Sequence, residues 1–308
     1  MRPPLKKGKP EIDSFPSHTY FNDRILTNLN ESSMERVRPV NMFIINSEVF
    51  LRLGFFLGVF FLMAAWETAA PRRNLTQSKL VRWTNNLGLT FLDSFVLRLV
   101  FPAAAVGSAL IAQQKGWGLF NAVSAPAWLS GAISILLLDL AIYAQHVAFH
   151  KLPPFWRLHR MHHTDLDIDV TTGARFHPVE IILSMAIKIG VVLALGAPAW
   201  AVVIFEILLN ATSMFNHSNI HINSSADKWI RRMIVTPDMH RVHHSVLIRE
   251  TDSNYGFNLS WWDRLFRTYR AQPKAGHHDM KIGLANYRDA RWLKLHWMLI
   301  VPFSRYER

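Results

Sequence analysis

Apolar and polar residues are segregated along the chain into long blocks. Residues 1–45 are polar, contain several Lys and Pro, and lack an apolar period, which predicts a mostly disordered tail. Five apolar segments follow, each near the length that a transmembrane helix needs. These segments are Phe50–Trp66, Leu89–Ala112, Ala127–Phe149, Val179–Leu195 and Ala199–Met214. Only Gly196-Ala197-Pro198 separates the last two, which predicts a helical hairpin that either spans the bilayer or dips in and returns.

The chain changes character from His217 onwards, because Trp and Arg alternate with other polar residues and no long apolar block recurs. We interpret this part as a cap of short helices lying on one membrane face. No stretch of any length has the period-two pattern of a half-buried strand. The sequence therefore predicts an all-α fold, an integral membrane bundle of about four or five membrane helices with a helical, His-rich cap on one face.

The composition limits the kinds of site that the cap can contain. The 308 residues include no Cys, which excludes disulfides, thiolate metal sites and Cys nucleophiles. The net charge is +12, but the basic residues lie beside apolar spans and no nucleic-acid motif is visible. We therefore attribute the charge to an anionic membrane surface and expect no nucleic-acid partner.

Ten of the 15 histidines fall into four short clusters. The clusters are His146-Val-Ala-Phe-His150, His159-Arg-Met-His162-His163, His217-Ser-Asn-Ile-His221 and His240-Arg-Val-His243-His244. In order they read HxxxH, HxxHH, HxxxH and HxxHH, so one pattern occurs twice, each time after an apolar helix. Residues i, i+3 and i+4 share a helix face, so each cluster directs two or three imidazoles towards one point.

The number of clustered imidazoles indicates two metal ions. Burying ten rings without metal would leave many polar nitrogens unsatisfied. Structural zinc is one alternative, but such sites usually close with four ligands and often use Cys. Imidazole also suits iron, which has the redox chemistry that zinc lacks. We therefore predict two iron ions with about five nitrogen ligands each. The predicted ligands are His146, His150, His159, His162, His163, His217, His221, His240, His243 and His244.

The four clusters, in this order, resemble the histidine boxes of the fatty acid hydroxylase/sterol desaturase superfamily, and the chain looks closest to its bacterial members. The resemblance covers about Leu137 to Gln272. Supporting segments are Arg157-Leu-His-Arg-Met-His-His163, Arg175-Phe-His-Pro-Val-Glu180, Asn254-Tyr-Gly256 and Trp262-Asp-Arg-Leu-Phe266. The resemblance implies a di-iron centre, O₂ as co-substrate, an external electron donor and a lipid substrate.

This resemblance suggests a division of the chain into four parts. They are a tail (1–45), N-terminal membrane helices (46–125), a di-iron catalytic domain (126–272) and a C-terminal tail (273–308). The positive-inside rule places the loop containing Arg72 and Arg73 in the cytosol and the Lys115 loop outside, although it disfavours the external basic tail that follows. We expect a bacterial inner-membrane protein whose catalytic face is cytosolic.

Two residues on the helix of the first cluster are expected to support its ligands. Asp139 and Tyr143 precede His146 by seven and three residues, so they share its helix face. An acid in an apolar span is a functional hypothesis by default, and Asp139 would accept a hydrogen bond from a ligand imidazole. The alternative is a plain interhelical hydrogen bond to a group such as Arg98.

Two further residues outside the clusters are candidates for supporting roles. His177 resembles the superfamily's extra His and would bond Glu180 or the outer side of a ligand, unless it merely begins an interfacial helix. Asn254 would position a water between the metals or, alternatively, form a turn. We expect no catalytic residue beyond the metal ligands and no organic cofactor, since no GxGxxG follows a strand.

The function expected from these features is hydroxylation of a lipid alkyl chain, whether fatty acyl, sterol-like or ether lipid. Electrons would come from a separate ferredoxin-like or cytochrome/reductase-like partner. Desaturation and ether-lipid cleavage remain open, because the histidine boxes do not separate them. A metal transporter would need polar ligands in the middle of several spans, and the sequence suggests apolar mid-spans instead. A soluble nucleic-acid-binding protein is disfavoured by the spans.

Overall fold

Helices are the only regular secondary structure in the described part of the chain. The computed structural model describes the backbone of residues 39–123 and 125–305 and the side chains from residue 47 onwards. Residues 1–38 of the predicted tail lie outside the described residues, whereas residues 39–45 belong to a helix, so the prediction of a disordered tail is wrong there. Within the described ranges, extended pairing is limited to three isolated β-bridges. The prediction of an all-α fold is confirmed.

Six long helices make up the part of the fold that the sequence predicts as spans. They are α3 (Pro39–Ala69), α4 (Lys79–Val100), α5 (Ala104–Lys115), α7 (Ala127–Lys151), α9 (Pro178–Leu195) and α10 (Ala199–His217). The shorter α-helices are α6 (Leu119–Ala122), α8 (Pro153–His159), α11 (Ser224–Ile230), α12 (Pro237–His243), α13 (Ile248–Thr251), α14 (Trp261–Leu265), α15 (Gly276–Asp279) and α16 (Leu295–Ile300). Four 3₁₀ helices complete the list, η1 (His162–Thr164), η2 (Val170–Ala174), η3 (Ala290–Leu293) and η4 (Val301–Phe303).

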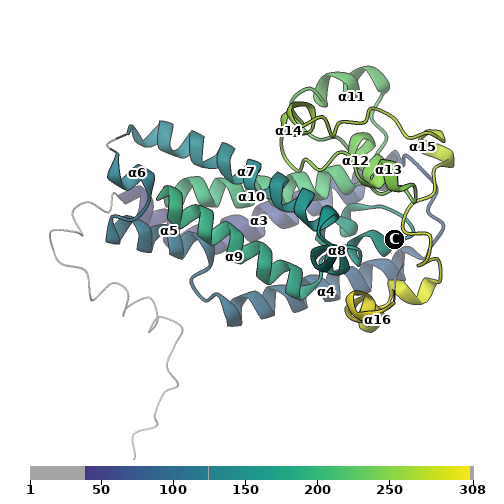
Figure 1. Cartoon of the computed structure of the whole chain (residues 1–308), viewed down its shortest axis with the longest axis horizontal. Coiled ribbons are helices and arrows are strands. Elements are labelled where there is room, and N and C mark those ends of the chain that lie inside the picture. Colours follow the sequence, from purple (N-terminus) through teal and green to yellow (C-terminus); the bar gives the residue numbers. More distant parts are fainter. Residues whose placement is uncertain (1–38, 124, 306–308) are drawn as a thin grey trace, which may run out of the picture. The chain divides into compact units, whose positions relative to one another are not determined.

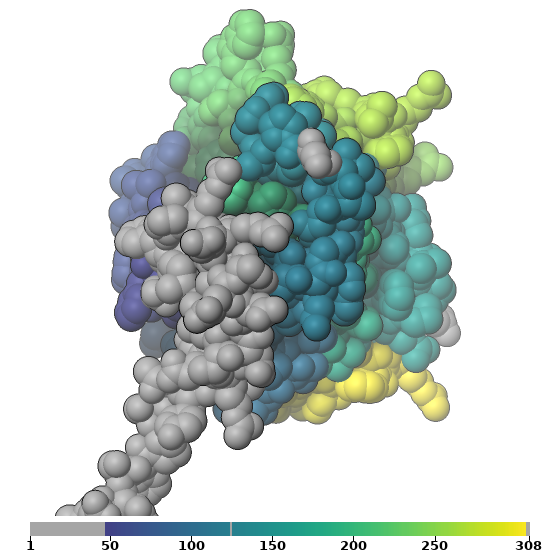
Figure 2. All heavy atoms as spheres, turned by 90° about the vertical axis from the view of Figure 1, so that its left-hand side faces the viewer, coloured from purple at the N-terminus to yellow at the C-terminus, as the bar shows by residue number. Residues whose placement is uncertain are grey.

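Residues 44–308 form one compact unit in which the long helices run side by side. Figure 1 shows α11 to α15 gathered at one end of this bundle, and we call them the cap. The helices α5 and α6 lie at the other end. Figure 2 views the bundle from that far end, where the segment containing α5 and α6 forms much of the visible surface.

Among the described residues, five segments have the length and hydropathy to cross a membrane. They are Ser47–Ala69, Lys79–Ala122, Ala127–Lys151, Pro178–Leu195 and Ala199–His217, and the second comprises α4, α5 and α6. Large apolar side chains point outwards from them, among them Phe50, Phe61 and Phe91, which are 77%, 64% and 78% exposed. Water would penalise this surface, whereas lipid would not. The protein is an integral membrane protein.

The second predicted span, Leu89–Ala112, is wrong in its boundaries. The helix α4 begins ten residues earlier, at Lys79, and ends at Val100. Pro102 cannot donate the backbone hydrogen bond that a continuing helix needs, and it disfavours helical geometry at Phe101. The polar start of α4 is helical because its Arg82 and Asn86 are buried against η2 rather than exposed to lipid.

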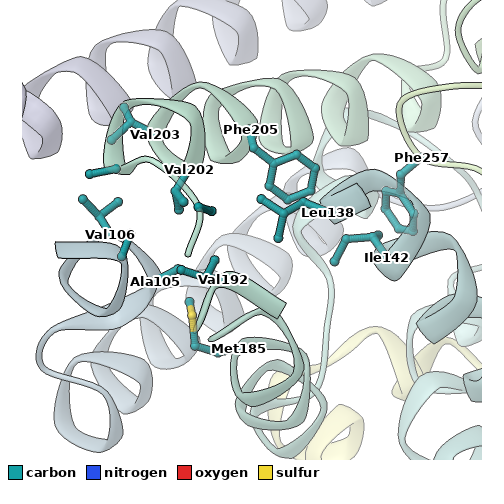
Figure 3. Packing of buried hydrophobic residues seen from close by; sticks show 13 residues of the cluster. Ala105, Val106, Leu138, Ile142, Met185, Val192, Val202, Val203, Phe205 and Phe257 are labelled. Carbon is teal, nitrogen blue, oxygen red and sulfur yellow. The ribbon is translucent and has the colours of Figure 1, made fainter. Parts of the chain in front are cut away.

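An apolar core between α5, α7, α9 and α10 packs these four helices against one another (Figure 3). Val106, Leu138, Met185 and Phe205 each bring a side chain from one of these four helices. The tight α9–α10 hairpin ends α9 at Gly196, whose φ of 62° suits glycine. The packing leaves both arms of this hairpin long enough to span.

A buried polar layer joins the loop after the second His cluster to α4. Arg82 donates from Nε to Asp165 at 2.8 Å and also pairs with Asp169, and all three side chains are inaccessible to solvent. Burial alone would raise the pKa of Asp165, but the Arg82 guanidinium overrides it and lowers that pKa to about 2. The loop is thereby fixed to α4 directly after the second His cluster.

Candidate metal centre

Nine of the ten clustered histidines converge into two groups at the cap end of the bundle. In each group one ring nitrogen per histidine lies within 4.8 Å of all the others. The first group is His146, His150, His159, His163 and His243. The second group is His162, His217, His240 and His244. All nine are buried, none being more than 3% exposed.

The direction of the helices explains this convergence. The helices α7 and α10 both run towards the cap, so their last turns deliver His146 and His150 from one and His217 from the other. The short α12 presents His240 and His243 three residues apart on one face. The remaining ligands come from α8, from η1 and from the residue after α12.

Backbone carbonyls determine which ring nitrogen carries the proton. His146, His162, His217 and His243 place Nδ1 at 2.7, 2.9, 2.7 and 2.7 Å from the carbonyl oxygens of Tyr255, Arg175, Ser213 and Ser253. A carbonyl oxygen only accepts, so each Nδ1 must donate. The Nε2 atom of each of these rings is therefore an unprotonated lone-pair donor, the form that binds a metal.

The contacts between these lone pairs test whether the site fits a metal. Nε2 of His162 lies 3.1 Å from Nε2 of His217, and neither atom carries a proton. Two lone pairs at this distance repel each other unless a cation lies between them. In addition, both ring nitrogens of His163 and His244 lack a hydrogen-bond partner among the described residues although they are buried. The all-nitrogen donor set fits two metal ions, one in each group.

Burial keeps the ligand imidazoles outside the membrane spans neutral. Desolvation lowers the pKa of His159 to about 3, and it holds the pKa values of His162, His163, His240 and His244 well below the ordinary value. A neutral imidazole has the lone pair that a cation requires. At neutral pH these rings are ready to coordinate.

Two carboxylates that contact the outer side of ligand rings were missed as site residues by sequence reasoning. Glu180 Oε1 lies 2.7 Å from Nδ1 of His159, and Asp252 Oδ1 lies 3.4 Å from Nδ1 of His150. Glu180 stands in the Arg175–Glu180 segment that carries the superfamily resemblance, so that segment was the available signal. Asp252 lies about a hundred residues from His150 in the chain, and no local pattern indicates it.

The expectation that His221 shares a helix face with His217 is wrong. The helix α10 ends at His217, so the spacing of four residues no longer places both rings on one side. Ile220 instead forms a β-bridge with Pro71, and the His221 amide donates to the Ala70 carbonyl. His221 is exposed and belongs to neither group.

Neither Asp139 nor Tyr143 makes the contact with a ligand ring that their helix face predicts. Asp139 Oδ2 accepts from the Trp262 indole at 2.8 Å and from the Leu259 amide at 3.2 Å. Tyr143 shares a hydrogen bond with Thr268, 2.9 Å away. Both residues therefore join α7 to the cap, because their hydrogen-bond partners lie in and around α14. Arg98, the partner considered for Asp139, is exposed.

His177 begins a helix and Asn254 forms a turn, which are the structural alternatives to their expected supporting roles. His177 caps α9 by accepting from the Val179 amide at 3.2 Å, and Glu180 bonds His159 instead. Asn254 has a φ of 54° and bridges Met239 and Arg270 through hydrogen bonds of 2.8 Å to each carbonyl. This turn orients the neighbouring carbonyls of Ser253 and Tyr255 towards two ligand rings.

A cavity of about 300 Å³ leads from the bundle to the first group and includes His146 and His159 in its wall. The deeper wall contains an ion cluster in the middle of the spans, in which Glu206 accepts from Lys188 at 2.8 Å and pairs with Arg52 at 3.1 Å. The prediction of apolar mid-spans is wrong at Lys188 and Glu206, because these two opposite charges pair with each other inside the protein.

Comparison with known proteins agrees with this geometry. Residues 131–268 match the family model described as fatty acid hydroxylase. The chain is 27% identical over 173 residues to an ornithine lipid hydroxylase from Rhizobium tropici, covering 56% of this chain and 50% of the relative. It is 28% identical over 188 residues to an alkylglycerol monooxygenase from Xenopus tropicalis, covering 60% of this chain and 41% of the relative.

A third relative extends the range of reactions among the similar proteins. The chain is 29% identical over 167 residues to a Delta(7)-sterol-C5(6)-desaturase from Nicotiana tabacum, covering 51% of this chain and 57% of the relative. The chain thus spans about half the length of the relatives that it matches. No solved structure matches it.

Proposed function

We propose that this chain, which belongs to the fatty acid hydroxylase superfamily, hydroxylates an alkyl carbon of a membrane lipid with two iron ions, O₂ and external electrons. The observation that carries the proposal is the meeting of buried, unprotonated Nε2 atoms from separate helices, as in His162 and His217. Iron bound there would supply the oxidation of an unactivated C–H bond by O₂, chemistry that side chains lack.

The two groups would each hold one ion, with five ligands in the first and four in the second. In hydroxylation, one oxygen atom enters the C–H bond and the other leaves as water. Two electrons and two protons from a separate donor complete the balance. The residues of this chain bind the ions, hold the protons at Nδ1 and exclude water from the buried site. The cavity beside His146 and His159 would admit the lipid.

Desaturation and ether-lipid cleavage are alternative outcomes on the same scaffold. The printed names of the relatives include a desaturase and an alkylglycerol monooxygenase. In desaturation the substrate loses two hydrogens and both oxygen atoms leave as water. Metal transport is not favoured, because both histidine groups lie at one end of the bundle and the mid-span charges are paired with each other.

The proposal is tested by comparing lipid extracts from cells with and without the gene. Mass spectrometry should find one lipid class gaining a single oxygen atom when the wild-type chain is expressed. The change should vanish with His163→Ala from the first group or with His244→Ala from the second. A loss of two hydrogens would assign desaturation instead.

Metal analysis of the purified proteins accompanies this comparison. The wild-type chain should hold about two iron atoms, and each of the two variants about one, because each removes a ligand from one group. His221→Ala is the matched control and should retain both iron atoms. A wild-type protein with zinc in both sites after iron-replete expression, or with unchanged lipids, would refute the proposed function.

A further inference from the structure

The cavity beside the metal centre contains a carboxyl group without a partner. Asp93 lies on α4 and lines this cavity, and it is only 6% exposed. Its Oδ1 atom has no hydrogen-bond partner, and the group forms no ion pair, among the described residues. A buried charge inside a membrane span is costly unless another group pairs with it.

The other buried carboxyl groups of the described span segments do have partners. Glu206 pairs with Lys188 and Arg52, Glu180 contacts His159, and Asp139 accepts from Trp262. Glu67 accepts from two backbone amides. Asp93 differs from them in having neither a hydrogen bond nor an ion pair among the described residues, whereas Glu180, which lines the same cavity, leaves only its Oε2 without a partner.

A second acceptor without a partner lines the same volume. Gln145 donates from Nε2 to the Ser184 hydroxyl at 3.0 Å, and its Oε1 has no partner among the residues the structure describes. The cations of the cavity wall, Lys188 and Arg52, already have carboxylate partners, since both pair with Glu206 and Arg52 also pairs with Glu48. The cavity thus offers unpartnered oxygens of Asp93, Glu180 and Gln145 to whatever enters it, and a cationic hydrogen-bond donor would satisfy these oxygens and compensate the charge of a carboxylate.

The size of the cavity indicates how much of a molecule it encloses. At about 300 Å³ it is at the lower limit for ligand pockets. It can hold a polar group and a short piece of chain, so the rest of a lipid must extend into the bilayer. Ser94 and Asn210 line the cavity and are exposed at the bundle surface, which provides such exits.

We propose that Asp93 binds a protonated amine in the polar part of the lipid substrate, with Gln145 accepting a second hydrogen bond. The inference rests on the proposed function, since it assigns a class to the lipid that enters the site. Because His146 and His159 line the same cavity, the amine end of the lipid lies near the metal centre. The oxidised carbon is then close to the amine rather than at the far end of a chain.

Binding measurements test this without relying on turnover. The purified full-length protein in phosphatidylcholine nanodiscs is titrated with dodecylamine, N-acetyl-dodecylamine and dodecanol, and binding is measured by calorimetry. The wild-type protein should bind dodecylamine at least about tenfold more tightly than the two neutral compounds, as for a hydrogen bond to a charged group. Asp93→Asn should abolish the preference.

The matched control is Asp139→Asn, the same change at a buried span carboxyl that does not line the cavity. It should retain the preference for the amine. Equal binding of the three compounds by the wild-type protein, or an unchanged preference in Asp93→Asn, would overturn the proposal. Loss of lipid oxidation alone would not, because an Asp93-dependent amine site can persist in a protein that fails the test of the proposed function.

Discussion

Main-chain carbonyls accept hydrogen bonds from the Nδ1 atoms of four imidazoles in the two histidine groups, and this arrangement decides which substitutions can test the site. The carbonyl oxygens of Arg175, Ser213, Ser253 and Tyr255 persist whatever side chain stands at those positions. Glu180, by contrast, contacts His159 through its side chain. Substitution of Glu180 is therefore the direct way to test how an outer hydrogen bond tunes a ligand.

Glu180→Gln should weaken iron binding or slow turnover about ten- to hundredfold, the usual scale for loss of an outer-sphere partner. The amide keeps the shape but is a weaker hydrogen-bond acceptor for the His159 ring than a carboxylate would be. Iron affinity is measured by competition with a chelator. Asp139→Asn should leave the affinity unchanged, because Asp139 contacts Trp262 rather than a ligand ring. Equal losses in both variants would argue against a specific role for Glu180.

Hydrogen bonds of buried polar side chains, rather than a run of apolar residues, explain why α4 begins at Lys79. Its first turns contain Arg82 and Asn86. Arg82 donates to Asp165 before η2, while Asn86 donates to Thr171 within η2 and accepts from Arg175 directly after it. A hydropathy pattern places these residues outside a span, since it does not anticipate that they pack against protein. The element is thus held to the loop that carries the second His cluster.

Arg82→Ala should lower the free energy of unfolding by about 3–5 kcal/mol, because it leaves Asp165 and Asp169 buried without their cation. Denaturant titration of the purified protein in detergent measures the effect. Arg291→Ala, which breaks an ion pair with Asp289 whose two side chains are 51% and 61% exposed, should cost less than about 1 kcal/mol. If both changes had similar effects, the buried pairs would not be what holds α4 to the loop.

At the scale of the whole molecule, both histidine groups lie at the cap end, and orientation in the membrane decides which compartment they face. Arg72 and Arg73 are at the same end, since they bond to Asp238 and to the backbone near α15. Lys115 lies at the end of α5, away from the cap. The positive-inside rule then favours a cytosolic cap.

Cysteine labelling can test this orientation, because the natural chain has no Cys and only an introduced cysteine would react with the label. In spheroplasts, a membrane-impermeant maleimide should label Lys115→Cys, whereas Arg291→Cys should react only after the membrane is broken. Arg291 lies at the cap end, because the carbonyl of its neighbour Trp292 accepts from Arg175, whose own carbonyl contacts His162. Both positions are exposed in the folded protein, so accessibility differs only by side of the membrane. The reverse pattern would place the metal centre outside the cytosol.

The sequence by itself determined the membrane bundle, the all-α class and the nine converging histidines among the ten that are clustered. Hydropathy is a property of contiguous segments, and ligand spacing is a property of a single helix, so both are local and readable along the chain. The error at His221 has the same origin, because the spacing rule holds only while the helix continues and α10 ends at His217.

Only the tertiary structure decided the contacts between segments distant in sequence. These include the separation of the histidines into groups of five and four, the role of Glu180, and the partners of Asp139 and Asn254. The charged residues Lys188 and Glu206 could not be matched from sequence, since helical packing sets which faces meet. The unpartnered Asp93 is visible only when every neighbouring helix is in place. The reason is that burial and pairing depend on the whole fold.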